Sequence, residues 1–174
     1  FNLLKSHSMS DSTDLVKDTK YDVGLVGIYR AGNFGGAITY YALYHVLEDL
    51  GYSTLMIERP KSSKAKARPI EYTYIENPYP EYVLSKEYAN KNAMRDLNDL
   101  CSSFVVGSDQ LFNDNLYNAL DQWITLDWVS DNKNKIAYAA SYGHDYIWSS
   151  ENTRAKMSYF MKKFDAFSVR EKSG

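Results

Sequence analysis

The sequence predicts an α/β fold, in which a Rossmann-like parallel sheet carries helices on both faces. Three observations support this prediction. The length of 174 residues suits one domain. Short apolar runs of strand length recur along the chain, as expected for strands that are buried on both faces. Segments with helical spacing separate these runs, and alternating strands and helices favour a parallel sheet with right-handed crossovers.

The first strand is predicted over 21–29, where YDVGLVGIY forms an apolar run. A helix is predicted over 37–50, and Gly51 follows it as the C-terminal stop. Helical spacing divides this segment into a buried face and a solvent face. The predicted buried face holds Thr39, Ala42, Leu43, Val46, Leu47 and Leu50, and the predicted solvent face holds His45, Glu48 and Asp49.

The rest of the chain continues the alternation. A second strand is expected over 52–58, and the Lys-rich, then Pro- and Tyr-rich stretch 61–81 is expected to form a long irregular excursion. The later elements are predicted in this order: a polar helix over 84–100, a strand over 103–107, a loop with Trp123 and Trp128, a strand over 135–141, a helix over 150–163 and a strand over 165–169.

The two ends of the chain suggest how it is organised. Residues 1–20 are rich in Ser, Asp, Lys and Thr without an apolar period, so we expect a disordered leader or linker. Residues 21–174 are then expected to form one Rossmann-like domain. Because the chain begins with Phe1 and stops just after the predicted fifth strand, our hypothesis is that it is the N-terminal half of a larger protein.

Composition excludes several classes of protein. The 20 Lys and Arg residues nearly balance the 22 Asp and Glu residues, which argues against a nucleic-acid partner. The single cysteine, Cys101, excludes a disulfide framework and a multi-cysteine zinc site, and we expect it to be an ordinary buried thiol. We expect no metal and no resident cofactor. Without a long apolar segment or a signal segment, a cytoplasmic protein with at most peripheral membrane association is expected.

The aromatic content allows two interpretations. The chain contains sixteen Tyr, seven Phe and three Trp residues. Flat amphipathic rings suit carbohydrate surfaces, but tyrosine also fills half-buried positions in many proteins. Composition therefore does not decide between a sugar-binding surface and an ordinary core.

Ligands of open parallel sheets bind beyond the carboxyl ends of the strands. After the first predicted strand, the segment 30–36 contains three glycines and opens directly into a helix. Its backbone N–H groups and the helix N-terminus can hold an anion or a sugar hydroxyl. The alternative is a tight turn that needs glycine for its backbone conformation.

Polar residues also follow the later strands. After the third strand, Asp109 can orient or deprotonate a hydroxyl. The alternative is that Ser108 or Asp109 caps the next element. Near it, Gln110 and Asn113 can bind further hydroxyls and Phe112 can stack on a ring. The fourth strand is followed by Ser141, Tyr142, Gly143 and His144, and the fifth by Arg170 and Glu171. His144 is either a general acid or phosphate ligand, or a surface histidine.

Four blocks in this order resemble one family. They are Gly32-Asn33-Phe34-Gly35-Gly36-Ala37, Phe104-Val105-Val106-Gly107-Ser108-Asp109-Gln110, Ala139-Ala140-Ser141-Tyr142-Gly143 and Phe164-Asp165-Ala166-Phe167-Ser168-Val169-Arg170-Glu171. The sequence resembles the polysaccharide pyruvyl transferases over about residues 21–171. It departs from the family's pattern at Phe112, where Trp is common, and at Phe34-Gly35-Gly36, which replaces Tyr-Gly-Ala.

The resemblance implies one half of a two-domain fold of the glycosyltransferase GT-B type. It implies transfer of a pyruvyl group from the co-substrate phosphoenolpyruvate to two hydroxyls of a glycan or lipid-linked sugar acceptor, which gives a ketal and phosphate. The other half is expected to hold much of the donor site and the catalytic histidine, so the present chain alone is expected to be nearly inactive.

The resemblance also assigns site residues. It implies that Asn33, Phe34 and Gly35 line the cleft, that Asp109, Gln110 and Phe112 bind the acceptor, and that Arg170 and Glu171 organise the domain junction. Asp109 is the catalytic candidate because its carboxylate can deprotonate a hydroxyl. The substrate-binding candidates are Asn33, Phe34, Gly35, Ser108, Gln110, Phe112, Asn113, Ser141, His144 and Arg170. Two alternatives stay open at this stage: a glycosyltransferase that uses a nucleotide sugar, and a non-catalytic module that binds a glycan or an anion.

Overall fold

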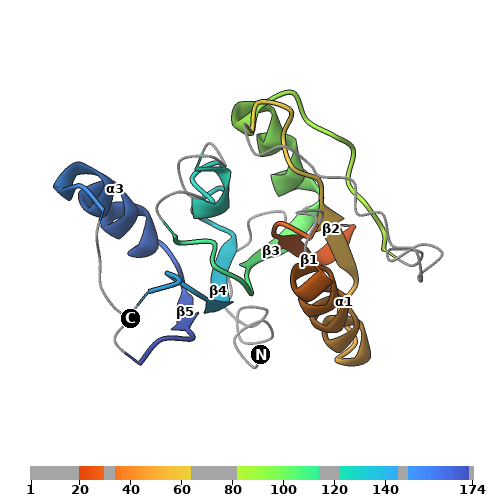
Figure 1. Cartoon of the computed structure of the whole chain (residues 1–174). Helices are drawn as coiled ribbons and strands as arrows, with labels where there is room; N and C mark the ends of the chain where they lie inside the picture. The colour runs from red at the N-terminus through yellow and green to blue at the C-terminus, as the bar shows by residue number, and fades with distance from the viewer. Residues whose placement is uncertain (1–19, 30–33, 64–81, 114–121, 145–148, 173–174) are drawn as a thin grey trace, which may run out of the picture.

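The computed structural model describes residues 20–29, 34–63, 82–113, 122–144 and 149–172 (Figure 1). Five parallel strands form one sheet in the order β2-β1-β3-β4-β5, which confirms the predicted α/β class. The strands are β1 (Tyr21–Val26), β2 (Thr54–Ile57), β3 (Cys101–Val106), β4 (Asn134–Ala140) and β5 (Ala166–Val169). Within the described residues the helices are α1 (Phe34–Asp49), α3 (Glu151–Met161) and the 3₁₀ helices η3 (Lys91–Asp99) and η4 (Trp123–Thr125).

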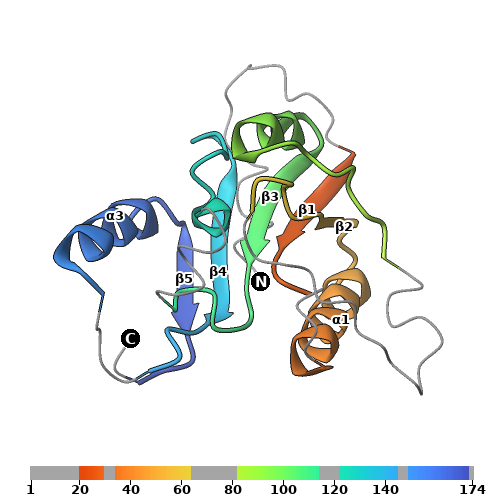
Figure 2. The same ribbon diagram turned by 45° about the horizontal axis from the view of Figure 1, so that its top comes forward.

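Helices cover both faces of the sheet, as predicted. Right-handed crossovers put α1 and α3 on opposite faces, because the chain moves outward from β1 in one direction and from β3 in the other (Figures 1 and 2). The side chains of α1 pack with Val23, Leu25 and Val105 in one core cluster. The helices η3, η4 and α3 pack in the other cluster, around Phe104 and Val106.

Helix α1 differs from the sequence prediction in its start and in its buried face. It begins at Phe34, so Gly35 and Gly36 lie in its first turn and not in a loop. The residues that it buries are Gly36, Ala37, Tyr40, Leu43, Tyr44 and Leu47. Of the predicted buried face only Leu43 and Leu47 are buried, whereas Ala42, Val46 and Leu50 are exposed.

Two tyrosines explain the rotation of α1. A Cβ atom on Gly27 would lie 2.0 Å from the ring of Tyr40, so this ring rests directly on the backbone at the end of β1. The Tyr44 hydroxyl donates a hydrogen bond to the carbonyl of Thr54 at 3.2 Å and accepts one from the N–H of Val83 at 3.1 Å. Both phenols are therefore held against the sheet, and the aliphatic residues Val46 and Leu50 turn outward.

The predicted helix over 84–100 is wrong in its first half. The N–H of Met56 donates to the carbonyl of Val83, and the N–H of Ser85 donates to the carbonyl of Met56, so this segment pairs with β2. The helix begins only after Asn90, whose side chain accepts a hydrogen bond from the N–H of Ala93 at 3.0 Å. Most of the predicted excursion, residues 64–81, lies outside the described residues, as does the predicted leader over 1–19.

We predict that Gly27→Ala destabilises the protein strongly. The new methyl group overlaps the ring of Tyr40, which is fully buried and has no free space to move into. We expect the free energy of unfolding to fall by about 3 kcal/mol, as for severe overpacking of a core. Urea denaturation followed by circular dichroism measures this change.

Gly36→Ala is the matched control. A Cβ atom on Gly36 meets its nearest neighbour at an ordinary distance of 3.5 Å. We therefore expect its unfolding free energy to change by less than about 1 kcal/mol. Equal losses in the two variants would contradict the role that we give to the contact between Gly27 and Tyr40.

Candidate functional site

The candidate site lies along the carboxyl ends of the strands. Since all strand pairs are parallel, these ends meet at one edge of the sheet, where the arrowheads point in Figure 2. The segments that follow β3, β4 and β5 bring polar residues to this edge, and the first turn of α1 also lies there. Asn33, a predicted member of the site, lies outside the described residues.

Hydrogen bonds join the segment after β3 to the segment after β4. The N–H of Ser141 donates to the carbonyl of Asp109 at 2.8 Å, and the N–H of Phe112 donates to the carbonyl of Ser141 at 3.1 Å. The side chains of Ser108 and Asn113 donate to the carbonyls of Ala139 and Tyr142 at 3.0 and 3.3 Å. The two segments therefore form one connected structure.

Three predicted binding residues are part of this framework. Ser108, Asn113 and Ser141 are buried, and their side chains make hydrogen bonds within the protein. Phe112 is only 1% exposed and stacks on Phe167, with ring centroids 5.4 Å apart. The expectation that Phe112 stacks on a sugar ring is therefore not met by this structure, because its faces are covered by other aromatic rings.

Asp109 is half-buried and points one carboxylate oxygen toward α1. Its Oδ2 atom lies 3.5 Å from the position that a Cβ on Gly36 would take, in the first turn of the helix. Its Oδ1 atom accepts a hydrogen bond from the N–H of Gln110 at 2.7 Å. The positive end of the helix dipole stabilises a negative charge at this place.

The backbone of Asp109 is strained. Its φ angle is 129°, a conformation that residues with a side chain rarely adopt. The carbonyl of Asp109 accepts hydrogen bonds from Ser141 and Leu111, which hold this conformation. Such strain often occurs where a side chain must be presented in a fixed direction at a functional site.

The charges of Asp109 and Arg170 both act on the phenol of Tyr40. Burial raises the pKa of Tyr40, the nearby charge of Asp109 raises it further, and Arg170 acts in the opposite sense. Both charged side chains therefore lie within electrostatic reach of this one phenol, which stays neutral. Arg170 is itself exposed, and its N–H is fixed to the carbonyl of Ala140 at 3.0 Å.

Glu171 forms a second polar centre with the segment after β4. Its Oε1 atom accepts a hydrogen bond from the hydroxyl of Ser141 and one from the N–H of Gly143 at 3.3 Å. Burial raises the pKa of Glu171, but these bonds and others from backbone N–H groups outweigh burial, so the pKa lies below its ordinary value. The sequence prediction gave Glu171 only a role at a domain junction.

The other predicted residues lie at the rim. Gln110 is exposed. Its Oε1 atom lies 2.9 Å from the position that a Cβ on Gly143 would take, so the Gln110 side chain fits there only because residue 143 is glycine. His144 is half-buried, and Phe34 and Gly35 are exposed in the first turn of α1. Burial and the charge of Glu171 raise the pKa of Tyr142, which therefore stays neutral; its ring lies 5.9 Å from that of Phe112.

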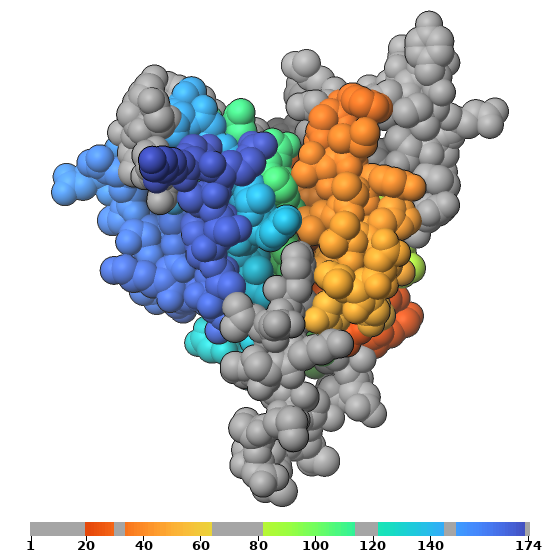
Figure 3. All heavy atoms as spheres, turned by 90° about the horizontal axis from the view of Figure 1, so that it is seen from below, coloured from red at the N-terminus to blue at the C-terminus, as the bar shows by residue number. Residues whose placement is uncertain are grey.

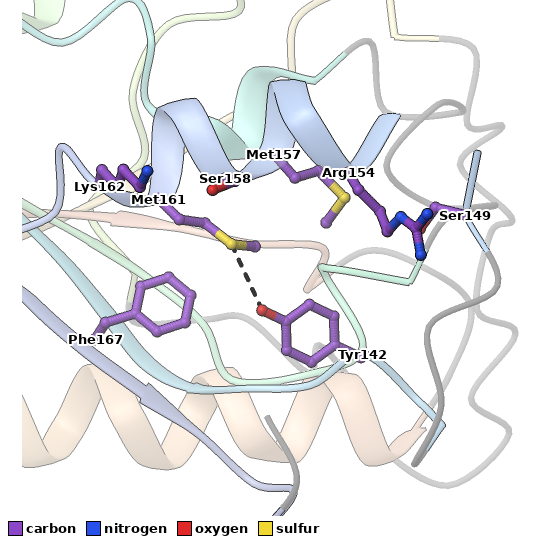
Figure 4. A pocket seen from close by; sticks show the side chains of 8 residues that line it. All are labelled: Tyr142, Ser149, Arg154, Met157, Ser158, Met161, Lys162 and Phe167. Carbon is purple, nitrogen blue, oxygen red and sulfur yellow. Dashed lines mark hydrogen bonds between the residues drawn. The ribbon is translucent and has the colours of Figure 1, made fainter. Parts of the chain in front are cut away.

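A pocket of about 430 Å³ opens under α3, next to this polar site (Figure 4). Met157, Met161 and Phe167 give it an apolar wall. The hydroxyl of Tyr142 points into it and donates to the sulfur of Met161 at 3.5 Å. The sequence analysis missed this pocket, because its lining comes from α3, β5 and the segment after β4. The remaining lining residues are Ser149, Arg154, Ser158 and Lys162.

Other groups in the described structure do not add to the site. Cys101 is buried, as predicted, and burial raises the pKa of its thiol to about 12, so it is not a nucleophile at neutral pH. In the described ranges, no three His, Cys, Asp or Glu side chains are grouped so that they could hold a metal ion. None of the helices described is both long enough and apolar enough to cross a bilayer.

The described structure is a Rossmann-like α/β fold with polar residues gathered at the carboxyl edge of a parallel sheet. The sequence model of the family described as polysaccharide pyruvyl transferase matches residues 33–174, and the chain belongs to that family. Its members are transferases that act in polysaccharide synthesis. No curated protein and no solved structure matches the chain.

We predict that Glu171→Gln removes part of the pH dependence of stability. Because the pKa of Glu171 is lower in the folded state than its ordinary value of 4.5, its carboxylate stabilises the fold above that value. This stabilisation is lost as the pH falls through the folded-state pKa. We therefore expect Glu171→Gln to be less stable than the parent at neutral pH, with the difference disappearing in acid.

Urea denaturation at a series of pH values measures this effect. Glu87→Gln is the control, since Glu87 is an exposed residue whose carboxylate pairs with Lys61 at 3.2 Å. A stability difference between Glu171→Gln and the parent that stays constant into acid would show that the Glu171 carboxylate is not held as described.

Proposed function

We propose that the protein transfers a pyruvyl group from phosphoenolpyruvate to two hydroxyls of one sugar in a glycan acceptor, which forms a cyclic ketal and releases phosphate. Membership of the polysaccharide pyruvyl transferase family supports the transferase class and the glycan acceptor. Phosphoenolpyruvate is a cytoplasmic metabolite, so the proposal places the reaction in the cytoplasm.

The reaction needs three kinds of groups. The methylene carbon of the donor gains one proton and becomes a methyl group. Two acceptor oxygens form bonds to the carbon that carried the phosphate, and the C–O bond to phosphate breaks. The acceptor loses two hydroxyl protons. One of them is matched by the proton that the methylene carbon gains, and the other is taken up by the released phosphate. An acid, a base near the hydroxyls and cationic groups for phosphate serve these needs.

Asp109 is the proposed base for an acceptor hydroxyl. Its carboxylate lies at the edge where ligands of parallel sheets bind, and its strained backbone keeps the side chain at that edge. Gln110 and His144 at the rim are placed to bind further hydroxyls of the sugar. Arg170 and the first turn of α1 supply positive potential beside the carboxylate.

One observation supports this proposal most strongly. Asp109 and the first turn of α1 come from segments far apart in the sequence, and Oδ2 of Asp109 lies 3.5 Å from the position of a Cβ on Gly36 in that turn. A single charged residue after one strand is common in loops and would not by itself indicate a ligand site. A carboxylate that is brought against a helix N-terminus from a distant segment instead suits a ligand that presents hydroxyls.

We predict acceptor-dependent release of phosphate from phosphoenolpyruvate. The test incubates the full-length protein with phosphoenolpyruvate and a panel of glycans, measures free phosphate, and identifies the product by its mass and the methyl signal of the ketal. Phosphate that forms without acceptor would indicate simple hydrolysis. Turnover of a nucleotide sugar in place of phosphoenolpyruvate would contradict the proposal and favour a glycosyltransferase.

We predict that Asp109→Gly separates stability from activity. Glycine tolerates the φ angle of 129°, so this change relieves strain, and we expect the unfolding free energy to rise by about 1 kcal/mol. Loss of the base should lower acceptor-dependent turnover by about 100-fold or more. Asp109→Asn keeps the shape and should lose a similar share of turnover.

Ala139→Gly is the matched control for this experiment. Ala139 also has a positive φ, of 48°, and lies in β4, where the backbone carbonyl that accepts from Ser108 is kept in glycine. We expect it to become more stable and to keep its turnover. If Asp109→Gly lost stability and activity together, Asp109 would be a structural residue of the turn and not the base.

A further inference from the structure

The outer face of α1 carries an apolar stripe that the fold leaves exposed. Its residues follow one another at intervals of four, so they form a single ridge along the helix. Ile38 is 53% exposed, Val46 45% and Leu50 46%, and Phe34 at the start of the helix is 53% exposed. Figure 3 looks at the face of the sheet that α1 covers, and α1 stands out from it in orange and gold. The stripe consists of Phe34, Ile38, Ala42, Val46 and Leu50.

The exposure of this stripe is a consequence of the fold and not of a weakly apolar sequence. Tyr40 and Tyr44 hold the opposite face of α1 against the sheet, so these aliphatic side chains cannot reach the core. A continuous apolar ridge over a whole helix is unusual on an isolated monomer and typically marks an interface.

From this geometry we infer that the stripe is an interface between two copies of the chain, in which two α1 helices cross in antiparallel directions at Ala42. The stripe is nearly symmetric about that residue: Ile38 and Val46 lie four positions before and after it, and Phe34 and Leu50 lie eight positions away. A two-fold axis through Ala42 therefore places Ile38 of one copy against Val46 of the other.

The size of the central residue fits this arrangement. Two ridges with a spacing of four residues pack at a crossing angle of about −50°, with the closest approach at the centre. The smallest side chain of the stripe, Ala42, occupies that centre, where the backbones approach most closely. Larger residues lie on both sides, where the diverging helices leave more room.

Charge at the two ends of α1 also favours an antiparallel copy. The first turn has no acidic residue, and the last turn has no basic residue but contains Glu48 and Asp49. Acidic groups at the C-terminal end oppose the dipole of their own helix. In the proposed pair, Asp49 of one copy lies near the first turn of the other, where the dipole favours a negative charge.

The same charges disfavour a membrane as the occupant. Helix α1 contains no Lys or Arg, whereas helices that lie on anionic lipid carry a basic polar face. The length of α1 limits the strength of the dimer, since one crossing helix pair buries less than the roughly 1,200 Å² of a standard interface. We therefore expect a dimer that dissociates on dilution.

Cross-linking of Ala42→Cys tests the position of the two-fold axis. At the crossing point the two Cα atoms come within disulfide range, about 4–6 Å, so oxidation should give a covalent dimer. The native Cys101 does not interfere, because it is buried and its thiol has a pKa raised to about 12. Lys156→Cys on the exposed surface of α3 is the control and should not cross-link.

Sedimentation of the full chain over a dilution series tests the energetics. The parent should shift from monomer to dimer with concentration, and Val46→Lys should raise the dissociation constant about tenfold or more while its circular dichroism stays unchanged. Asp49→Lys should also weaken the dimer, although it improves the dipole of its own helix.

Three results would overturn the inference. The first is a monomer at every concentration without a cross-link from Ala42→Cys. The second is a dimer that Val46→Lys leaves unchanged. The third is a monomer that binds anionic vesicles through the stripe, with binding lost in Val46→Lys, since this would make the occupant a lipid surface. None of these results depends on turnover, so they are independent of the proposed reaction.

Discussion

The contact between the ring of Tyr40 and the backbone of Gly27 fixes where α1 lies, and the site depends on that position. The ring occupies the space of the missing Cβ atom, so α1 can approach the end of β1 closely. Its first turn then reaches Asp109, which lies beyond the end of the neighbouring strand β3. A bulkier residue at position 27 would move the helix and with it the positive end of its dipole.

The polar residues of the site fall into two groups. The first group makes hydrogen bonds that hold the segments together, and the second group carries charged side chains at the edge of the sheet. Ser108, Asn113 and Ser141 bind backbone or neighbouring side chains, and they join the segments after β3 and β4. Asp109 and Arg170 are fixed through their backbones by the same network, and the carboxylate of Asp109 accepts only the N–H of Gln110 among the hydrogen bonds described. A site that must hold a charged side chain in a strained conformation needs such a framework.

The sequence predicts the five strands and the edge at which the site lies, because buried parallel strands are recognisable as apolar runs and their carboxyl ends must meet. It does not predict the buried face of α1, since tyrosine suits both core and surface and the deciding partner, Gly27, lies outside the helix. The paired segment around Val83 and Leu84 is missed for a similar reason, because its partner strand lies about 28 residues earlier in the sequence. Likewise, the internal bonds of Ser108 and Asn113 join residues about 30 positions apart.

The balance of charge indicates which substrate the described part of the site suits. Tyr40 and Tyr142 stay neutral because burial and neighbouring carboxylates raise the pKa of each phenol. The charged groups described at the edge itself are the carboxylates of Asp109 and Glu171 and the guanidinium of Arg170, whereas Arg154 and Lys162 line the pocket beside it. A donor with a phosphate and a carboxylate needs more positive charge than one Arg and a helix terminus supply. Neutral sugar hydroxyls, in contrast, donate readily to carboxylates, so Asp109 and Glu171 support our proposal that this edge of the sheet binds the acceptor.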